Sequence, residues 1–218
     1  MFVTKGKTAE VFWLLAYVLL LFLSAIVRDF VIAPYVTHHM SGIEAVLIEP
    51  IWKLLFWIVP TFLYIRFVER QNPFTYLKLT TNLLKGLLWG LAGMAFLVAA
   101  EFPLILGHTP NFQFGTDTLI NVILLVGFME EIPFRGFLFQ KLQEWLGFFG
   151  AMLLSSLLFA LIHVPLWVST GSFTVSQVLN FVMVFIVGLL ACYTLKRSGS
   201  LWSSILLHTF YNILANIF

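Results

Sequence analysis

The sequence predicts an all-α polytopic membrane protein, a bundle of about seven transmembrane helices with its N-terminus inside and its C-terminus outside. Of the 218 residues, 61% are hydrophobic and only 10% are charged, and the mean hydropathy is +0.98. A soluble domain has about a quarter of its residues charged. The 24 Phe and 7 Trp residues suit helices that face acyl chains and membrane interfaces. Lipid is therefore the main solvent of this chain.

Each predicted helix is a segment long and apolar enough to cross the hydrocarbon core, which takes roughly 20 residues. The seven segments are 9–27, 46–66, 83–106, 118–140, 148–168, 174–195 and 200–218. Lys5 and Lys7 precede the first segment, as basic residues precede the core of a signal peptide. The segment is longer than such a core and has no clean cleavage site after it, so we expect a retained helix.

The positive charges are distributed unevenly between the two ends of these helices. With the N-terminus inside, only Arg28 falls outside, while Lys53 and Arg135 lie within helices. The other nine of the twelve basic residues lie at cytoplasmic ends: Lys5, Lys7, Arg66, Arg70, Lys78, Lys85, Lys141, Lys196 and Arg197. This positive-inside bias supports both the helix count and the orientation. The net charge of +2, without a basic patch, argues against a nucleic-acid partner, and the lone Cys192 excludes an internal disulfide.

Charged side chains near the bilayer centre are costly, so each one is a functional-site hypothesis. The fourth predicted helix places Glu130, Glu131 and Arg135 in mid-span. Glu131 and Arg135 are four residues apart, so we expect them to pair on one helical face. Glu130 is rotated by about 100° and is expected to have no committed partner. The alternative is a buried network that only fixes helix packing. Pro133 is expected to open the local helix.

Two further helices contribute polar groups. Phe159 and His163 end the fifth segment, while His208 and Asn212 in the seventh are four residues apart and should face one side. The helical rise puts Glu130 and His208 at similar depths, roughly 15 and 13 Å from the cytoplasmic helix ends. On the same reckoning His163 lies higher, at roughly 20–24 Å, so its helix must tilt or begin deeper.

A different ion pair is expected in the second predicted helix. Glu49 and Lys53 are four residues apart near its outer end, and we expect them to pair with each other.

Several protease chemistries are excluded by inspection. The sequence has no His-Glu-x-x-His and no Gly-x-Ser-x-Gly motif, and its two aspartates, Asp29 and Asp117, lie at predicted helix ends. A carboxylate with an imidazole remains, and this pair can activate water as a general base. His208 and Asn212 can then donate hydrogen bonds to a developing oxyanion.

Three short motifs stand in order on these helices. They are Glu130-Glu131-Ile-Pro-Phe-Arg135, Phe159-Ala-Leu-Ile-His163 and His208-Thr-Phe-Tyr-Asn212. Together they resemble the CPBP family of CAAX proteases and bacteriocin-processing enzymes, also called the ABI family. The resemblance covers 118–218 well and 72–106 weakly, through Asn72-Pro73-Phe-Thr-Tyr-Leu-Lys-Leu79. Leu201-Trp202-Ser203, which leads into the last helix, is also similar to the family.

The resemblance implies an intramembrane endopeptidase of the CAAX-protease type. Glu130 and His163 would activate the water, and His208 and Asn212 would bind the substrate carbonyl and the oxyanion. Three residues would shape the site: Glu131, Arg135 and Phe159. The chain would be one transmembrane domain, 1–218, with its catalytic core helices in 118–218. No cofactor is assigned, and zinc is the metal that Glu130, His163 and His208 would suit by ligand type.

The expected location is a cell membrane, as a multi-pass protein of the bacterial inner membrane, where prenylated CAAX proteins are not expected. The expected partners are membrane lipid and a membrane-associated peptide or protein substrate, such as a bacteriocin or signalling precursor. Two alternatives stay open. The protein is a non-catalytic bacteriocin-immunity factor or scaffold that binds a partner in the same cavity, or it is a proton-coupled transporter. Against transport, the sequence shows no inverted repeat.

Overall fold

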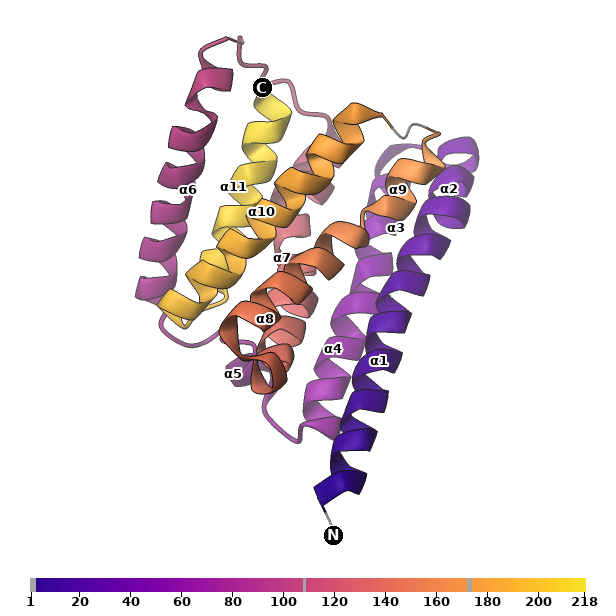
Figure 1. Cartoon of the computed structure of the whole chain (residues 1–218). Coiled ribbons are helices and arrows are strands. Elements are labelled where there is room, and N and C mark those ends of the chain that lie inside the picture. The colour runs from indigo at the N-terminus through magenta and orange to yellow at the C-terminus, as the bar shows by residue number, and fades with distance from the viewer. Residues whose placement is uncertain (1–2, 108, 172–173) are drawn as a thin grey trace.

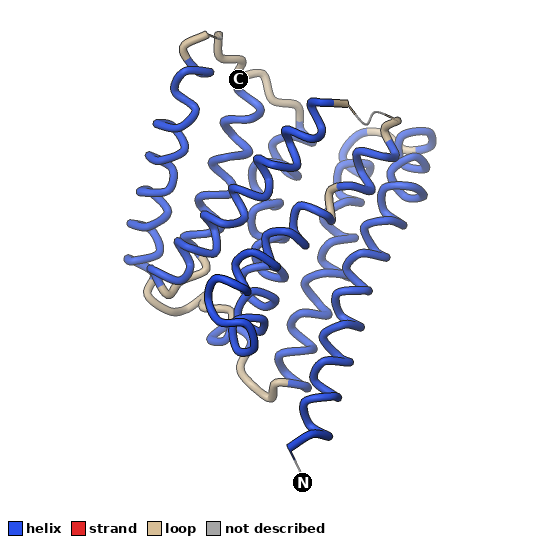
Figure 2. Tube along the Cα trace, in the orientation of Figure 1, coloured by secondary structure: helices blue, strands red, loops and turns tan. Residues whose placement is uncertain are grey.

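The chain folds into a bundle of helices, as the computed structural model in Figures 1 and 2 shows. The structure describes residues 3–107, 109–171 and 174–218, and among these it contains helices and connecting segments but no strand. The predicted all-α bundle is confirmed. The helices, with π-helical segments written η, are α1 (Val3–Val27), η1 (Arg28–Ile32), α2 (Ala33–His39), α3 (Gly42–Lys53), η2 (Leu54–Ile58), α4 (Val59–Leu63), η3 (Tyr64–Val68), α5 (Pro73–Tyr76), α6 (Leu83–Ile105), η4 (Thr118–Leu125), α7 (Val126–Glu131), η5 (Ile132–Phe139), α8 (Gln140–Leu161), α9 (Val164–Ser169), α10 (Val175–Ser198) and α11 (Trp202–Ile217).

Five helical stretches among the described residues are long and apolar enough to cross a membrane. They are Thr8–His39, Gly42–Val68, Leu83–Ala100, Thr118–Ser169 and Val175–Ser198. A multi-pass membrane protein is therefore indicated. The number of crossings and their orientation stay predictions, because length and composition do not determine them.

The fourth of these stretches, 52 residues long, doubles back on itself. Gly147 has a φ of 67° and a ψ of −176°, which interrupts the helical path within α8. Beyond this turn, Ser155 donates a hydrogen bond to the carbonyl of Phe134 over 3.1 Å, so the two halves pack side by side. Dividing this stretch and adding α11 gives seven segments, the number expected from the sequence. The beginning of α1 and the end of α11 lie at opposite ends of the bundle, as an odd number requires (Figure 1).

The first helix is longer than the predicted segment 9–27. It continues from α1 through η1 and α2 and ends only at His39. Pro34 does not stop the helix, because it follows directly on the π-helical segment η1. A residue without an N–H is tolerated where the hydrogen-bond register changes in this way.

Close packing holds α11 between α6 and α10. Gly86 and Gly90 of α6 face this region: an added Cβ would lie 2.6 Å from Ser200 Oγ and 2.9 Å from Leu206 Cδ1, respectively. Small residues at such positions let membrane helices approach closely. The position of α11, which carries His208, therefore depends on glycines in a helix outside the three motifs.

The turns at the end of the bundle where α1 begins are tied together by hydrogen bonds. Leu201 donates its backbone N–H to the carbonyl of Lys78 over 3.1 Å, and Trp202 donates its indole N–H to the carbonyl of Leu79 over 2.9 Å. These contacts join the segment before α6 to the start of α11. Both stretches resemble the family, and these hydrogen bonds give each of them a structural role.

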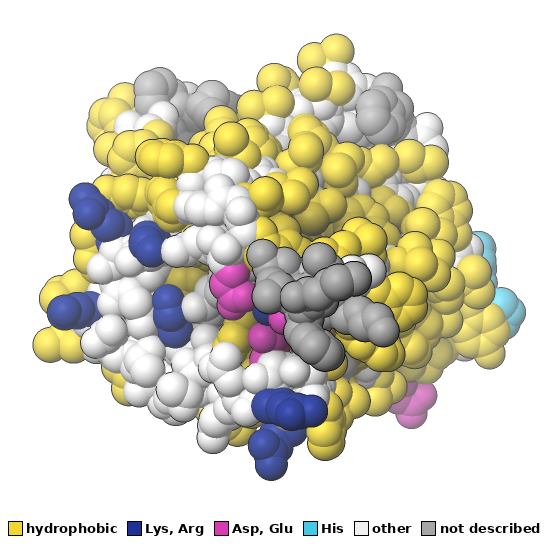
Figure 3. Space-filling view, turned by 60° about the horizontal axis from the view of Figure 1, so that its bottom comes forward, with side chains coloured by type: hydrophobic (Ala, Val, Ile, Leu, Met, Phe, Trp, Pro, Cys, Tyr) yellow, Lys and Arg dark blue, Asp and Glu magenta, His cyan; other side chains and the backbone are white. Residues whose placement is uncertain are grey.

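Basic side chains gather at this same end (Figure 3). Lys196 and Arg197, for example, occupy the last turn of α10. A cation is favoured there because the C-terminal end of a helix carries a partial negative charge. The side of the membrane that this end faces stays a prediction.

Candidate active site

The four predicted catalytic residues come from α7, from the junction of α8 and α9, and from α11, and they line one cavity of about 280 Å³. Its walls are Arg28, Glu49, Lys53, Trp57, Asn121, Val122, Val126, Glu130, Ile162, His163, Leu166, His208 and Asn212. The structure thus brings Glu130, His163, His208 and Asn212 together, while their chemical roles stay predictions.

Glu130 has a committed partner, contrary to the expectation of a free carboxylate. Lys53 Nζ lies 2.9 Å from Glu130 Oε1 and 2.8 Å from Glu49 Oε1. The predicted Glu49–Lys53 pair is therefore confirmed, but it is only half of the interaction. Lys53 ends α3, which packs against α7, so its ammonium also reaches Glu130, a contact that the sequence spacing does not show. The second oxygen, Glu130 Oε2, has no hydrogen-bond partner among the described residues.

Two imidazoles face this second oxygen. His163 Nε2 lies 3.7 Å from Glu130 Oε2, and His208 Nε2 lies 4.0 Å from it. His163 Nδ1 lies 2.8 Å from the carbonyl of Phe159, and a carbonyl only accepts, so Nδ1 carries the hydrogen. His208 Nδ1 likewise donates to the Glu131 carboxylate over 2.8 Å. Both rings are thereby oriented with Nε2 toward Glu130.

His163 reaches the cavity because its helix breaks there. Helix α8 ends at Leu161, and α9 begins after His163, with Pro165 in its first turn. The backbone at His163 has a φ of −87° and a ψ of −16°, a region where many active-site residues sit. Helix α8 also runs obliquely to α1 (Figure 1), in keeping with the expectation that this helix tilts.

The predicted pairing of Glu131 with Arg135 is confirmed. Arg135 Nη1 donates to Glu131 Oε1 over 3.0 Å, and both side chains are fully buried. The guanidinium also lies over the Phe159 ring, with Cζ 3.9 Å from the centroid. The same ring meets the imidazoles of His163 and His208 edgewise, at centroid distances of 5.0 and 5.5 Å. Glu131, Arg135 and Phe159 therefore support the two imidazoles from behind the cavity.

The backbone around the two glutamates is unusual. The π-helical segment η5 begins directly after Glu131 and contains Pro133, as expected from a proline that opens the local helix. Such segments are frequent at functional sites. Just before them, Gly127 faces α11, where an added Cβ would collide with Thr209 Oγ1 and lie 3.2 Å from the carbonyl of Ile205. This close approach of α7 and α11 lets Glu131 reach His208.

Asn212 is partly committed to the backbone. Its Nδ2 donates to the carbonyl of Val122 over 3.2 Å, while the side chain lines the same cavity as His208. A carboxamide nitrogen carries two hydrogens, so one donor remains for another group.

The three residues suggested for zinc do not form a metal site in this arrangement. Among the described residues, no group of three or more His, Cys, Asp and Glu side chains is placed to hold a metal ion. Zinc ligands lie about 2.0–2.2 Å from the metal. Here the ammonium of Lys53, a competing cation, is already 2.9 Å from Glu130.

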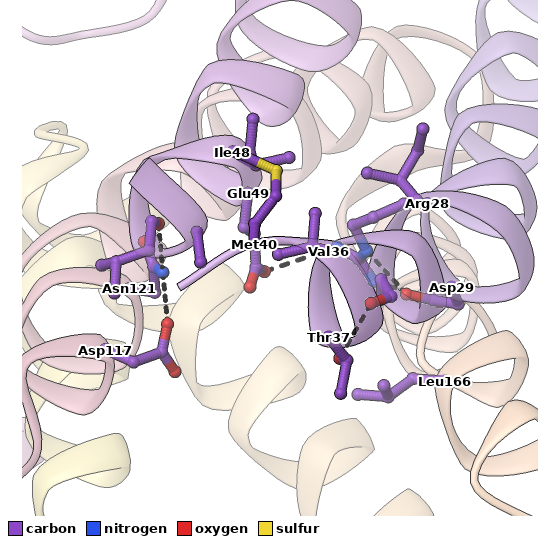
Figure 4. A pocket seen from close by; sticks show the side chains of 14 residues that line it. Arg28, Asp29, Val36, Thr37, Met40, Ile48, Glu49, Asp117, Asn121 and Leu166 are labelled. Atoms are coloured by element: carbon purple, nitrogen blue, oxygen red, sulfur yellow. Dashed lines mark hydrogen bonds and ion pairs between the residues drawn. The ribbon is translucent and has the colours of Figure 1, made fainter. Parts of the chain in front are cut away.

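A second cavity of about 420 Å³ adjoins the first. The two share a wall made of Arg28, Glu49, Asn121 and Leu166. In Figure 4, Arg28 donates to Asp29 over 2.7 Å, and Asn121 donates to Asp117 over 2.7 Å. Most other side chains on the walls are apolar, and Val36 and Met40 place the cavity near the far end of α2. A mainly apolar space therefore adjoins the site.

Two cations of the site, Lys53 and Arg28, are not among the predicted site residues, because the sequence places both at the outer ends of helices. A signal was present for Lys53, which stands in the largely apolar run Ile51-Trp52-Lys53-Leu54-Leu55. A charge within a membrane helix is a site candidate by default.

A comparison with protein families agrees with this geometry. The family model described as "Type II CAAX prenyl endopeptidase Rce1-like" matches residues 112–214, a range that contains all three motifs. No curated protein and no solved structure matches the chain. The family is one of CAAX-type intramembrane proteases, which are hydrolases. Residues 112–214 of this chain thus match the Rce1-like family of CAAX proteases, in agreement with the family that the three motifs resemble.

Proposed function

We propose that this protein is an intramembrane endopeptidase in which Glu130 and His163 together activate a water molecule. The observation that carries the proposal is the position of Glu130 Oε2, which has no hydrogen-bond partner among the described residues and lies 3.7 Å from His163 Nε2, an acceptor in its tautomer. Two acceptors so placed suit the two O–H donors of one water. As the oxygen attacks the peptide carbonyl, one of these acceptors takes the proton, which is general-base catalysis.

His208 and Asn212 are proposed to stabilise the oxyanion that forms on the substrate. Asn212 retains one amide hydrogen beyond its bond to Val122. His208 Nδ1 already donates to Glu131, so the ring donates to substrate only when Nε2 is also protonated. The carboxylates of Glu130 and Glu131 on either side of the ring would compensate that charge. Donors aimed at an oxyanion in a water-poor site act strongly.

The proposed substrate is a membrane-associated peptide or protein, such as a precursor trimmed in a bacterial inner membrane. The larger cavity supports this choice because it is mainly apolar and shares a wall with the site. The bacterial location rests on the one-sided distribution of Lys and Arg. The alternative is a non-catalytic immunity factor or scaffold that binds a partner in the same cavity. A protease needs the Glu130 carboxylate for the reaction, whereas such a binder does not.

The decisive experiment measures turnover of a candidate precursor peptide by purified protein in lipid nanodiscs. Glu130→Gln, His163→Ala and the double variant should be similarly inactive, because residues that act as one unit are strongly non-additive. Asn212→Ala should retain turnover reduced by about 10²–10³, the usual effect of one oxyanion donor.

Glu144→Gln is the matched control, since Glu144 is a half-exposed carboxylate outside the cavity and should keep wild-type turnover. Metal analysis and chelation complete the test. Loss of activity with a chelator and stoichiometric zinc would show instead that a bound metal activates the water. Full biological function of the Glu130→Gln strain at normal expression would favour the binder and defeat the protease proposal.

A further inference from the structure

We infer that Lys53 is a positioning residue for the reaction: it holds one oxygen of Glu130 and so presents the other to the two imidazoles. Lys53 belongs to α3, outside the residues that the family model matches. The inference rests on the proposed role of Glu130. It adds a requirement that the three motifs do not contain.

The contacts divide the Glu130 carboxylate into two unlike oxygens. Oε1 accepts from Lys53 Nζ over 2.9 Å, whereas Oε2 has no partner among the described residues and is the atom nearest both imidazoles. A carboxylate held at one oxygen cannot rotate freely about its last bond. The free lone pairs of Oε2 are therefore kept toward the site of the proposed water, and such orientation lowers the entropic part of a barrier.

Lys53 is itself held in place by neighbours on its own helical stretch and on α1. Glu49, one turn earlier, lies 2.8 Å from the ammonium, and the Trp57 ring, one turn later, has its centroid 5.5 Å away. Trp57 donates its indole N–H to Ser24 Oγ over 2.7 Å. Arg28 Nη1, at the start of η1, lies 3.8 Å from Glu49, so a chain of alternating charges runs from η1 to Glu130.

No other Lys or Arg among the described residues is available to replace Lys53. Arg28 is committed to Asp29 at 2.7 Å, and Arg135 to Glu131 at 3.0 Å. The Lys53 side chain is 5% exposed and that of Glu130 is 6% exposed. A buried carboxylate that loses its counter-charge is strongly disfavoured. Removing the ammonium should therefore change both the charge balance and the orientation of Glu130.

The chain offers a matched control in Lys141. Its side chain is 3% exposed and pairs with Glu69 and Glu144, each at 2.9 Å, much as Lys53 pairs with its two glutamates. Lys141 lines neither of the two cavities at the site. Lys141→Met thus removes a comparably buried and paired ammonium without touching Glu130.

The test compares kcat and KM of Lys53→Met, Lys53→Arg, Lys141→Met and Glu130→Gln on the same peptide, each checked for folding by size-exclusion chromatography. Lys53→Met should lower kcat by about 10²-fold, the scale that a 1 Å misplacement of a reacting group costs. KM should stay within about threefold, because the interaction is with Glu130 and not with substrate. Lys53→Arg should recover most of the lost kcat, and Lys141→Met should keep kcat.

The outcomes separate this inference from the proposed function. An active Glu130→Gln protein would defeat the proposed function itself. Inactive Glu130→Gln together with wild-type kcat in folded Lys53→Met would defeat only the positioning role. A loss confined to KM, or an equal loss of kcat in Lys53→Arg and Lys53→Met, would also overturn it.

If Lys53→Met does not fold, the double variant Lys53→Met/Glu130→Gln is examined by the same size-exclusion chromatography, to test whether the two side chains are coupled. Recovery of the fold in the double variant supports the coupling of these two side chains, and no recovery refutes it.

Discussion

Removal of the Glu131 carboxylate should destabilise the protein strongly, because it strands a buried cation. Glu131 Oε1 accepts from Arg135 over 3.0 Å and from His208 over 2.8 Å, and both members of the ion pair are 0% exposed. Glu131→Gln leaves the guanidinium without an anion. Breaking a buried pair from one side costs about 3–5 kcal/mol. The ring of Phe159 cannot compensate, since a cation–π contact is worth about 1–2 kcal/mol and is already present.

A double-mutant cycle tests this reasoning. Arg135→Met should cost a similar amount, because it leaves the Glu131 carboxylate with only His208. The double variant removes both charges, and a glutamine at position 131 still accepts from His208. Replacement of a buried ion pair as a whole is often neutral, so the double variant should lie within about 1–2 kcal/mol of wild type. The coupling energy is then several kcal/mol and far from additive.

The assay is reversible unfolding in mixed micelles of a mild detergent and dodecyl sulfate, followed by helical circular dichroism. Glu144→Gln is the control, because Glu144 pairs with Lys141 at 2.9 Å but is 49% exposed. Exposed pairs contribute about 0–1 kcal/mol, so this variant should unfold nearly as wild type does. If the losses of unfolding free energy add up in the double variant, the reasoning is refuted. Additive losses would mean that neither charge is left buried and unpaired when its partner is removed.

Three further predictions follow from the packing and the topology. Phe159→Ala should cost about 3–5 kcal/mol and Phe159→Leu distinctly less in the same unfolding assay, because only alanine leaves a large cavity behind the imidazoles; equal losses would contradict the role of this ring in packing. Gly188→Ala should cost about 1–3 kcal/mol by overpacking, since an added Cβ would lie 2.8 Å from Arg135 Nη2, whereas Gly115→Ala, with nothing within 4 Å, should be silent. In intact cells an impermeant thiol reagent should label Pro110→Cys but not Lys78→Cys, and the native Cys192 is buried; the opposite labelling pattern would overturn the N-in orientation.

Local periodicity was enough to predict several features of the site from sequence. The all-α membrane class followed from composition, and residues four apart on one helix share a face in any packing. For this reason the pairs Glu131–Arg135 and Glu49–Lys53 were predictable and are present at 3.0 and 2.8 Å.

The partner of Glu130, by contrast, could not be predicted from helical periodicity. Lys53 and Glu130 are separated by 77 positions, as are Glu131 and His208, and no helical repeat relates residues so far apart. The spacing of four residues predicts that Lys53 pairs with Glu49. It does not show that α3 packs on α7 closely enough for the Lys53 ammonium to reach Glu130 as well. Helical rise alone required the helix of His163 to tilt or to begin deeper, but it could not specify the oblique course of α8 or the break before α9, which arise from packing.

The sequence by itself determined which residues are costly in lipid and which of them share a helical face. Only the tertiary structure decided how the charges pair across helices, and hence which oxygen of Glu130 is left free. The physical reason is that helix formation is governed by contacts within a few residues, whereas pairing between helices depends on the tilt, depth and closeness of segments that meet only after folding. Glycines at the helix contacts, such as Gly127 against Thr209, help to set that closeness.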